Sequence, residues 1–157
     1  MPKTISYRFV RISTASPETL FDLVANADQW KHWAGPMVLT SYFAHLGPDD
    51  DGGVGSIRAL GPGLAVARER TTIHERPHRY GYVMAKDRAP LKGYRSLVEF
   101  EPHPAGTLVT WSGSFLESLP GSGGLVKLVF DQMMKDFLRR LVEHADALDA
   151  GLPPGPN

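Results

Sequence analysis

The chain contains no cysteine, which excludes disulfide bonds, thiol chemistry and zinc sites built from cysteine. It also has no excess of charge, because 17 Lys and Arg residues balance 17 Asp and Glu residues. That balance argues against a nucleic-acid partner. No run approaches the ~20 apolar residues of a membrane span, and the opening MPKTISYRFV is unlike a signal peptide. We therefore expect a cytoplasmic protein with no stable membrane insertion.

Signatures of common catalytic and metal sites are missing as well. The glycine-rich stretches lack the Gly-Lys-Ser/Thr of a phosphate loop, and no GxSxG nucleophile motif occurs. The histidines form no recognisable metal motif, and Asp49-Asp50-Asp51 lacks the spaced ligands of a calcium loop. The sequence therefore predicts no metal and no cofactor.

The most regular stretch is 125–148, which predicts a long amphipathic helix. Its apolar residues recur every three or four positions: Val126, Phe130, Met133, Met134, Phe137, Leu138, Leu141, Ala145 and Leu148. Opposite charges four residues apart support the solvated side, and the pairs are Asp131/Lys135, Asp136/Arg140 and Arg139/Glu143. Ser122 is the expected N-cap. About 24 residues at ~1.5 Å each give a rod of roughly 36 Å, which needs a broad partner surface.

Residues 4–12 are rich in β-branched and aromatic side chains, which predicts a strand. Val10 and Ile12 break the alternation of this segment, so we expect a bulge or burial on both faces. Ser16-Pro17 predicts the start of a helix. Asp28 is the expected cap of a second, short helix that carries Trp30 and Trp33.

Beyond residue 37 the pattern changes to strands separated by Gly, Pro and Asp turns. The predicted strands are 38–46, 54–60, 65–75, 79–86, 94–101 and 107–117. Short loops between consecutive strands indicate antiparallel neighbours. The order is therefore β-α-α-β-β-β-β-β-β-α, an α+β domain over 1–149, followed by a disordered Pro/Gly tail at 150–157.

Alternation in the last strand places Val109, Trp111 and Phe115 inside. Counting across the turn at 103–106 sets Val98 beside Trp111 and Tyr94 beside Phe115.

The same counting across 76–79 pairs Ile73 with Tyr82 and Thr71 with Met84. Glu69 and Ile73 then face inward, and His74 faces water. A slip of one residue would exchange Glu69 for Arg68 and Arg70.

Three segments resemble the START-like, Bet v 1-like (SRPBCC) helix-grip superfamily, in its polyketide cyclase/dehydrase and lipid-transport branch. They are SPETLFDLVANADQWKHW at 16–33, ERPHRYGYVM at 75–84 and YRSLVEFEPHPAGTLVTWSGSF at 94–115. The resemblance covers 5–148 and implies a curved antiparallel sheet of about seven strands wrapped around the C-terminal helix. It also implies an apolar cavity between them, which in such proteins binds lipids, sterols, quinones, hormones or polyketides.

The predicted interior is rich in aromatic and methionine side chains, which suit a pocket for a flat or greasy ligand. A filled core is the alternative interpretation. The predicted ligand-binding residues are Trp30, Trp33, Glu69, Ile73, Tyr82, Met84, Tyr94, Val98, Trp111, Phe115, Phe130, Met133, Met134 and Phe137.

Glu69 is the candidate catalytic residue, because burial in an apolar cavity raises a carboxyl pKa and suits acid–base work. The structural alternative is an ion pair with an arginine such as Arg58 or Arg95.

Three functions follow from these observations. The first is a carrier or binding protein for a hydrophobic small molecule that is lipid-like, polyketide-like or a quinone. The second is a polyketide aromatase/cyclase or dehydratase that uses Glu69 or an inward arginine with tyrosines. The third is a protein-interaction module of co-chaperone or toxin type. We expect a monomer or a homodimer.

Overall fold

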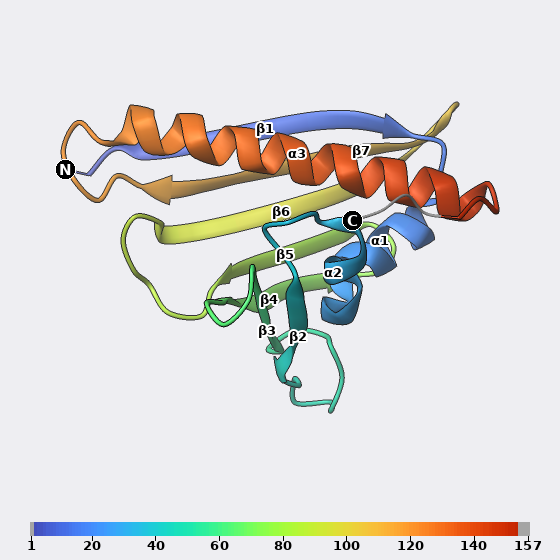
Figure 1. The fold of residues 1–157 in the computed structure, drawn as a ribbon, viewed down its shortest axis with the longest axis horizontal. Helices are drawn as coiled ribbons and strands as arrows, with labels where there is room; N and C mark the ends of the chain where they lie inside the picture. Colours follow the sequence, from blue (N-terminus) through green and yellow to red (C-terminus); the bar gives the residue numbers. More distant parts are fainter. Residues whose placement is uncertain (1, 154–157) are drawn as a thin grey trace.

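The computed structural model describes residues 2–153, and its elements follow the predicted order (Figure 1). The helices are α1 (Pro17–Ala25), the 3-10 turn η1 (Ala27–Gln29), α2 (Trp30–Trp33) and α3 (Gly123–Asp149). The strands are β1 (Thr4–Ser13), β2 (Thr40–His45), β3 (Ile57–Gly61), β4 (Ala67–Glu75), β5 (Arg79–Met84), β6 (Lys92–His103) and β7 (Gly106–Leu116). No helix within the described range is long and apolar enough to span a membrane.

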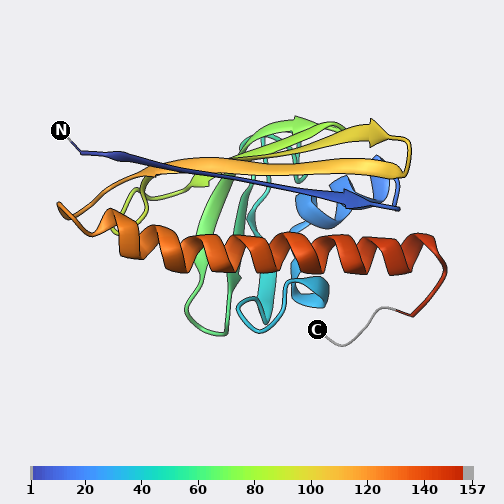
Figure 2. The same ribbon diagram turned by 90° about the horizontal axis from the view of Figure 1, so that it is seen from above.

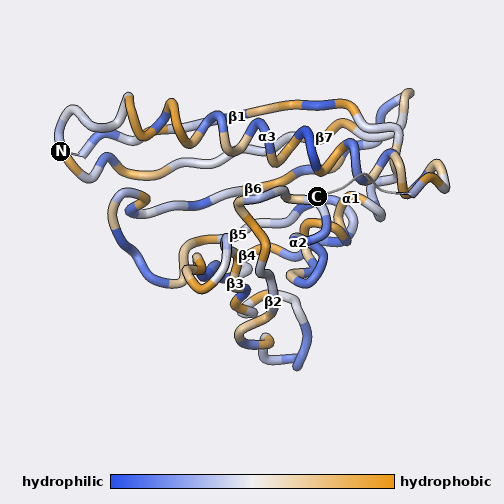
Figure 3. Tube along the Cα trace, viewed as in Figure 1, coloured by the Kyte–Doolittle hydropathy of each residue, from blue (hydrophilic) through white to orange (hydrophobic). Residues whose placement is uncertain are grey.

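The strands form one antiparallel sheet in the order β1-β7-β6-β5-β4-β3-β2. The sheet is strongly curved, and α3 runs along one face of it while α1 and α2 lie near one end (Figures 1 and 2). Along α3 the colouring alternates between hydrophobic and hydrophilic turns, as expected for a helix that buries one side (Figure 3). The predicted α+β helix-grip fold is confirmed.

The start of α3 differs in detail from the prediction. Ser122 occupies the N-cap position, but its side chain makes no cap bond and its Oγ donates to the Leu119 carbonyl. Glu117 supplies the acceptor instead, because its Oε1 receives the Gly123 N–H at 2.9 Å. The prediction for the solvated side holds for Arg139 and Arg140, which pair with acidic residues one turn away.

The prediction of an ion pair between Asp131 and Lys135 on α3 is wrong. Asp131 binds Lys127 at 2.8 Å, and Lys135 lies over the ring of Phe9 at 5.2 Å. A lysine on this side of the helix covers an aromatic ring that β1 leaves partly exposed, which is a favourable place for an ammonium group.

Two predictions near the N-terminus are also corrected. Val10 and Ile12 are exposed (45% and 49%), and β1 pairs with β7 without a bulge. The reason is that α3 covers only the other face of this edge strand. Asp28 is not a cap: the Asn26 side chain accepts the Asp28 N–H and opens η1. Ser16 does cap α1, through the Thr19 N–H.

The β6–β7 register is as predicted for Val98 and Trp111, but a β-bulge between Lys92 and Arg95 removes Tyr94 and Phe115 from the regular ladder. An extra residue on one strand shifts every later pairing, so counting from the turn fails beyond it.

The β4–β5 register contains a second irregularity, between Thr71 and Ile73. Thr71 faces Tyr82 and Glu69 faces Met84, whereas Ile73 faces Gly81. The predicted inward orientation of Ile73 is therefore wrong. The predicted outward orientation of His74 is wrong too, since its ring contacts Phe21 in the core with centroids 5.1 Å apart. The count from the turn is one residue off, because Glu75 pairs with Arg79, and the irregularity then returns Thr71 and Glu69 to the inner face.

At the C-terminal end of α3, Gly151 adopts φ 70 and donates to the Leu148 carbonyl, while the Leu152 N–H donates to Ala147. These bonds satisfy carbonyls that a helix end leaves free. The single domain and the disordered tail stay predictions, and residues 154–157 lie outside the described range.

Candidate ligand pocket

A pocket of about 480 Å³ lies between α3 and the strands β3–β6. Its walls also include the α2 end, the segment after α2, the β3–β4 turn and the β5–β6 loop. Lining residues from these parts are Trp30, Met37, Val38, Leu60, Val66, Ala67, Tyr82, Met84, Leu91, Tyr94, Phe130, Met133, Met134 and Phe137. Exposed Met37, Lys86 and Arg88 mark the side that opens to solvent.

The structure brings most of the predicted ligand-binding residues to this pocket. Those that line it are Trp30, Glu69, Tyr82, Met84, Tyr94, Phe130, Met133, Met134 and Phe137. The predicted residues outside the lining are Trp33, Ile73, Val98, Trp111 and Phe115.

The aromatic residues outside the lining support those that line it. Trp33 packs on Trp30 with ring centroids 4.5 Å apart, and its indole N–H donates to the Leu23 carbonyl. Trp111 meets Trp30 edge-on at 5.9 Å, and Phe115 meets Phe130 at 5.5 Å. Such ring pairs fix one another's orientation, so these residues form the rigid backing of the pocket wall.

A buried ion pair lies at the inner end of the pocket. Arg58 on β3 is opposite Glu69 on β4 in the sheet register. The Arg58 Nε and Nη2 atoms are both 2.8 Å from Glu69 Oε2. Arg58 is 1% exposed and Glu69 is 13% exposed at the side chain. Arg58, and not Arg95, is therefore the ion-pair partner of Glu69.

Aromatic rings surround the Arg58 guanidinium. Its Cζ lies 4.5 Å from the Trp30 ring centroid, 4.6 Å from Tyr82 and 5.0 Å from Tyr80. Its Nη1 donates to the Val24 carbonyl at 2.7 Å. Ring faces and a carbonyl stabilise a cation that has left water, so β3 can carry this arginine into the core.

Each of the two charges offsets the effect of burial on the pKa of the other group. Burial raises the pKa of the Glu69 carboxyl, and the Arg58 charge and hydrogen bond act in the opposite direction. Burial alone would lower the pKa of Arg58, but Tyr80 and Glu69 hold it above its usual value. Oε1 of Glu69 has no hydrogen-bond partner among residues 2–153, and Glu69 lines the pocket. It is a free acceptor for a guest.

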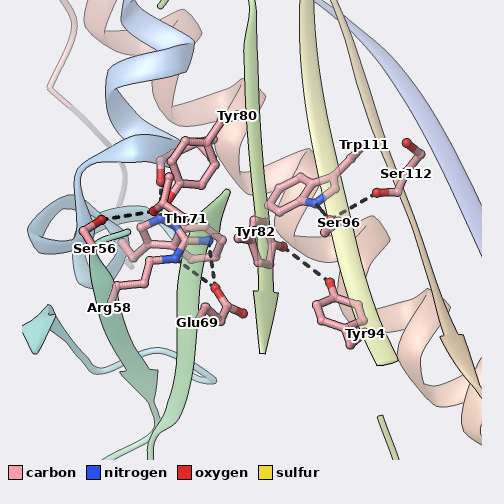
Figure 4. Close-up of polar contacts among 12 residues, drawn as sticks. Ser56, Arg58, Glu69, Thr71, Tyr80, Tyr82, Tyr94, Ser96, Trp111 and Ser112 are labelled. Carbon is pink, nitrogen blue, oxygen red and sulfur yellow. Dashed lines mark hydrogen bonds and ion pairs between the residues drawn. The ribbon is translucent and has the colours of Figure 1, made fainter. Parts of the chain in front are cut away.

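A chain of hydroxyl groups runs from Tyr82 on the pocket wall to Ser96, and Figure 4 shows its two ends, the Tyr82–Tyr94 contact and the contacts of Ser96. Tyr82 Oη lies 3.4 Å from Tyr94 Oη, which lies 2.9 Å from Tyr7 Oη. Tyr7 Oη lies 2.8 Å from Ser96 Oγ. Ser96 also donates to the Ser112 carbonyl and accepts the Trp111 indole N–H.

These phenols remain protonated under ordinary conditions. Burial raises the pKa of Tyr82 to about 12. Burial also raises the pKa values of Tyr94 and Tyr7 well above the ordinary range. The pocket wall therefore offers neutral hydroxyl groups beside one carboxylate.

The profile of the family described as polyketide cyclase/dehydrase and lipid transport matches residues 4–146. The chain belongs to this family. A comparison with curated proteins gives no match.

Solved structures of the same fold include the protein XoxI from Bacillus cereus, at 21% identity and a TM-score of 0.67, with 94% of this chain and 97% of that chain covered. A Thermobifida fusca protein has 20% identity and a TM-score of 0.70, with coverages of 93% and 95%. StfQ, a di-domain ARO/CYC from the steffimycin biosynthetic pathway, has 12% identity and a TM-score of 0.73. This chain is covered to 95% and StfQ to 53%. At these identities the likeness shows the fold and not the activity.

Within this family fold, sequence reasoning missed two parts of the site. Arg58 entered only as a partner for Glu69, although both residues are equally far from the centre of the β3–β4 hairpin. Opposite charges placed symmetrically about a turn are a usable signal for a cross-strand pair. The lining residues Met37, Pro62 and Leu91 lie in loops, and no periodicity marks their side chains.

Proposed function

We propose that this chain binds an apolar small molecule, lipid-like or polyketide-like, in the pocket between α3 and β3–β6. It acts as a carrier or binding protein, as a monomer or a homodimer. The observation that supports this function is the pocket itself, which holds about 480 Å³ and is lined mainly by aromatic, aliphatic and methionine side chains. Pockets of this size and character bury most of the surface of a small organic ligand.

The composition of the wall also fits a carrier. Met133 and Met134 on α3 face Met84 and Leu91 across the same pocket. Unbranched methionine side chains adapt to guests of different shape, whereas the aromatic backing keeps the overall outline fixed. The family description, which includes lipid transport, agrees with this function.

The direct test is titration of the purified chain with an apolar fluorescent dye, followed by competition with long-chain fatty acids and flat polycyclic compounds. We expect saturable binding of one dye per chain and displacement by a competitor. Native mass spectrometry of the same sample should detect a co-purified small molecule. A chain that binds no dye and releases no small molecule on solvent extraction would contradict the proposal.

Ala67→Trp locates the binding site. Ala67 on β4 lines the pocket, so an indole there should fill the space and weaken dye binding by at least about tenfold. The matched control is Ala105→Trp in the β6–β7 turn, an exposed alanine outside the lining. Equal losses in both variants would show that the dye binds elsewhere.

A second candidate function is polyketide cyclisation or dehydration. It is favoured by Glu69, whose raised pKa and free Oε1 suit a general base that removes a proton next to a ligand carbonyl. Tyr82 lies beside it in the pocket wall as a hydroxyl donor. Arg58 lies 2.8 Å from Glu69 Oε2 and favours the charged form of the carboxyl, so the geometry suits a base better than an acid.

Glu69→Gln separates the two functions. If the chain is an enzyme, this variant should lose turnover of a poly-β-keto substrate by at least about 100-fold while it still binds the dye. Survival of turnover would exclude Glu69 as the base. A solid interior would favour the interaction-module hypothesis, and the pocket gives that hypothesis no support.

A further inference from the structure

We propose that the inner end of this pocket selects a ligand that buries a hydroxyl group, an alcohol or a phenol on an apolar skeleton, over the corresponding carbonyl compound. The proposal rests on the proposed binding function and names the chemical class that the site prefers. It follows from the direction in which each hydroxyl in the Tyr82–Ser96 chain must donate its proton.

Ser96 fixes that direction. A serine hydroxyl has one proton to donate and two lone pairs to accept with. The Ser96 proton goes to the Ser112 carbonyl, which can only accept, at 3.1 Å. One lone pair receives the Trp111 indole N–H, which can only donate, at 3.0 Å. Ser96 Oγ also lies 2.8 Å from Tyr7 Oη, and because the Ser96 proton is already used, Tyr7 must be the donor in this contact.

The constraint then passes along the chain towards the pocket. Tyr7 donates its only proton to Ser96. The 2.9 Å contact between the Tyr7 and Tyr94 hydroxyl groups therefore requires Tyr94 to donate to Tyr7. Tyr94 Oη, buried and on the pocket wall, is left with lone pairs alone. The protons of Tyr94, Tyr7 and Ser96 therefore all point away from the cavity.

The inner end therefore presents two acceptors and one donor. The acceptors are Tyr94 Oη and Glu69 Oε1, and the donor is Tyr82, whose contact with Tyr94 is long at 3.4 Å. A ligand hydroxyl can donate to an acceptor and accept from Tyr82 at once. A ligand carbonyl can only accept, so it faces the Glu69 carboxylate without a proton between the two oxygens. A ligand carboxylate would meet like charge.

The experiment compares 1-(2-naphthyl)ethanol with 2-acetylnaphthalene, which are the alcohol and the ketone of one carbon skeleton. Each is titrated into the purified chain by calorimetry or by dye displacement. We expect the alcohol to bind at least about tenfold more tightly, the effect of one hydrogen bond to a charged group. Equal affinities, or a preference for the ketone, would overturn the proposal and leave the binding function intact. Failure of both compounds and of the dye would instead overturn the binding function itself.

Tyr7→Phe tests the cause of the preference, because Tyr7 does not line the pocket. Without the Tyr7 hydroxyl, Tyr94 is free to turn its proton towards the guest. The alcohol-to-ketone affinity ratio should then fall by at least about threefold. The matched control is Tyr80→Phe, which removes a buried phenol that bonds Thr71 and lies outside the lining. Its ratio should stay at the wild-type value.

Ser96→Ala provides a second route to the same test, since it removes the acceptor that orients Tyr7. Circular dichroism confirms that each variant is folded before titration. An unchanged alcohol-to-ketone affinity ratio in both the Tyr7→Phe and the Ser96→Ala variants would show that the row of hydroxyl groups from Tyr82 to Ser96 does not set the preference for the alcohol.

Discussion

Arg58 is the residue whose burial constrains the interior most. Its guanidinium is 1% exposed and depends on Glu69, the Val24 carbonyl and three ring faces. A buried pair of charges costs desolvation on both sides, and removal of one partner leaves the other unpaired in a poor solvent. The pair therefore fixes the register of β3 against β4. Its net contribution to the free energy of unfolding is small, because the desolvation cost offsets the attraction between the charges.

Glu69→Leu and Arg58→Met should each lower the free energy of unfolding by about 3–5 kcal/mol, because each leaves a buried charge alone. The double variant should recover most of that loss, since neither charge remains. Urea denaturation of the wild type and the three variants measures all four values. A double variant as unstable as the two single losses added together would show that the charges are independent.

The buried phenols predict a loss of stability at high pH. In the unfolded chain they release their protons near pH 10, whereas Tyr82 in the folded chain keeps its proton up to about 12. The folded state therefore binds more protons between these values, and the free energy of unfolding must fall as the pH rises through that window. Tyr7 and Tyr94 shift in the same direction and steepen the slope.

Denaturation curves measured from pH 8 to pH 11.5 check this slope. Tyr94→Phe removes one of the shifted groups and should make the slope shallower. A stability that does not change between pH 9.5 and pH 11.5 would be incompatible with phenols that stay protonated in the fold.

Among the secondary-structure elements, α3 is fixed chiefly at its C-terminal end. Asp146 accepts hydrogen bonds from Ser13 Oγ and from the backbone N–H groups of Thr14 and Ala15. Asp149 accepts from the Ser16 N–H and from Thr19. These bonds tie the helix to the connection between β1 and α1. The N-terminal half has fewer such bonds, from Lys127 Nζ to the Ser6 carbonyl and from the Gly123 N–H to Glu117, and it keeps Leu125, Leu128 and Val129 exposed.

Asp146→Ala should destabilise the chain by about 2 kcal/mol, because it leaves backbone N–H groups without their acceptor. The control is Glu143→Ala on the solvated side of the same helix, where an exposed ion pair with Arg139 contributes little. Thermal unfolding of the two variants compares them directly, and equal melting temperatures would contradict the clamp.

For the whole molecule, the decisive feature is how the curved sheet meets a straight helix. Trp111, Phe115 and Phe130 close the space beside β7, while the pocket remains between α3 and β3–β6. A filled interior is the main alternative to a pocket, and the space of about 480 Å³ beside α3 favours the pocket.

A ligand that fills this pocket should raise the stability of the chain by mass action, since the unfolded chain has no pocket. At a free concentration one hundred times Kd the gain is about 2.7 kcal/mol. Differential scanning fluorimetry should show a melting temperature that rises steadily with ligand concentration. Ala67→Trp should remove the rise, and Ala105→Trp should keep it.

Residue patterns within short stretches of the sequence were enough to predict most of the helices and strands. The heptad-like spacing from Val126 to Leu148 predicted α3, and the turn residues between strands predicted an antiparallel sheet. Register was predictable only where the length of the turn was counted correctly. Val98 and Trp111 pair as counted, but the count across 76–79 is one residue off at the turn itself, where Glu75 pairs with Arg79, so Ile73 faces Gly81.

The sequence by itself determined the order of elements, the apolar faces and the presence of an inward charge on β4, because each depends on contacts between residues close along the chain. Only the tertiary structure decided that Arg58 meets Glu69, that Tyr7 and Ser96 orient Tyr94, and that space remains beside α3. These features join residues from strands far apart in the sequence, and small shifts of register or curvature create or remove them. Pairwise distances of that kind are set by the packing of the whole sheet against the helix.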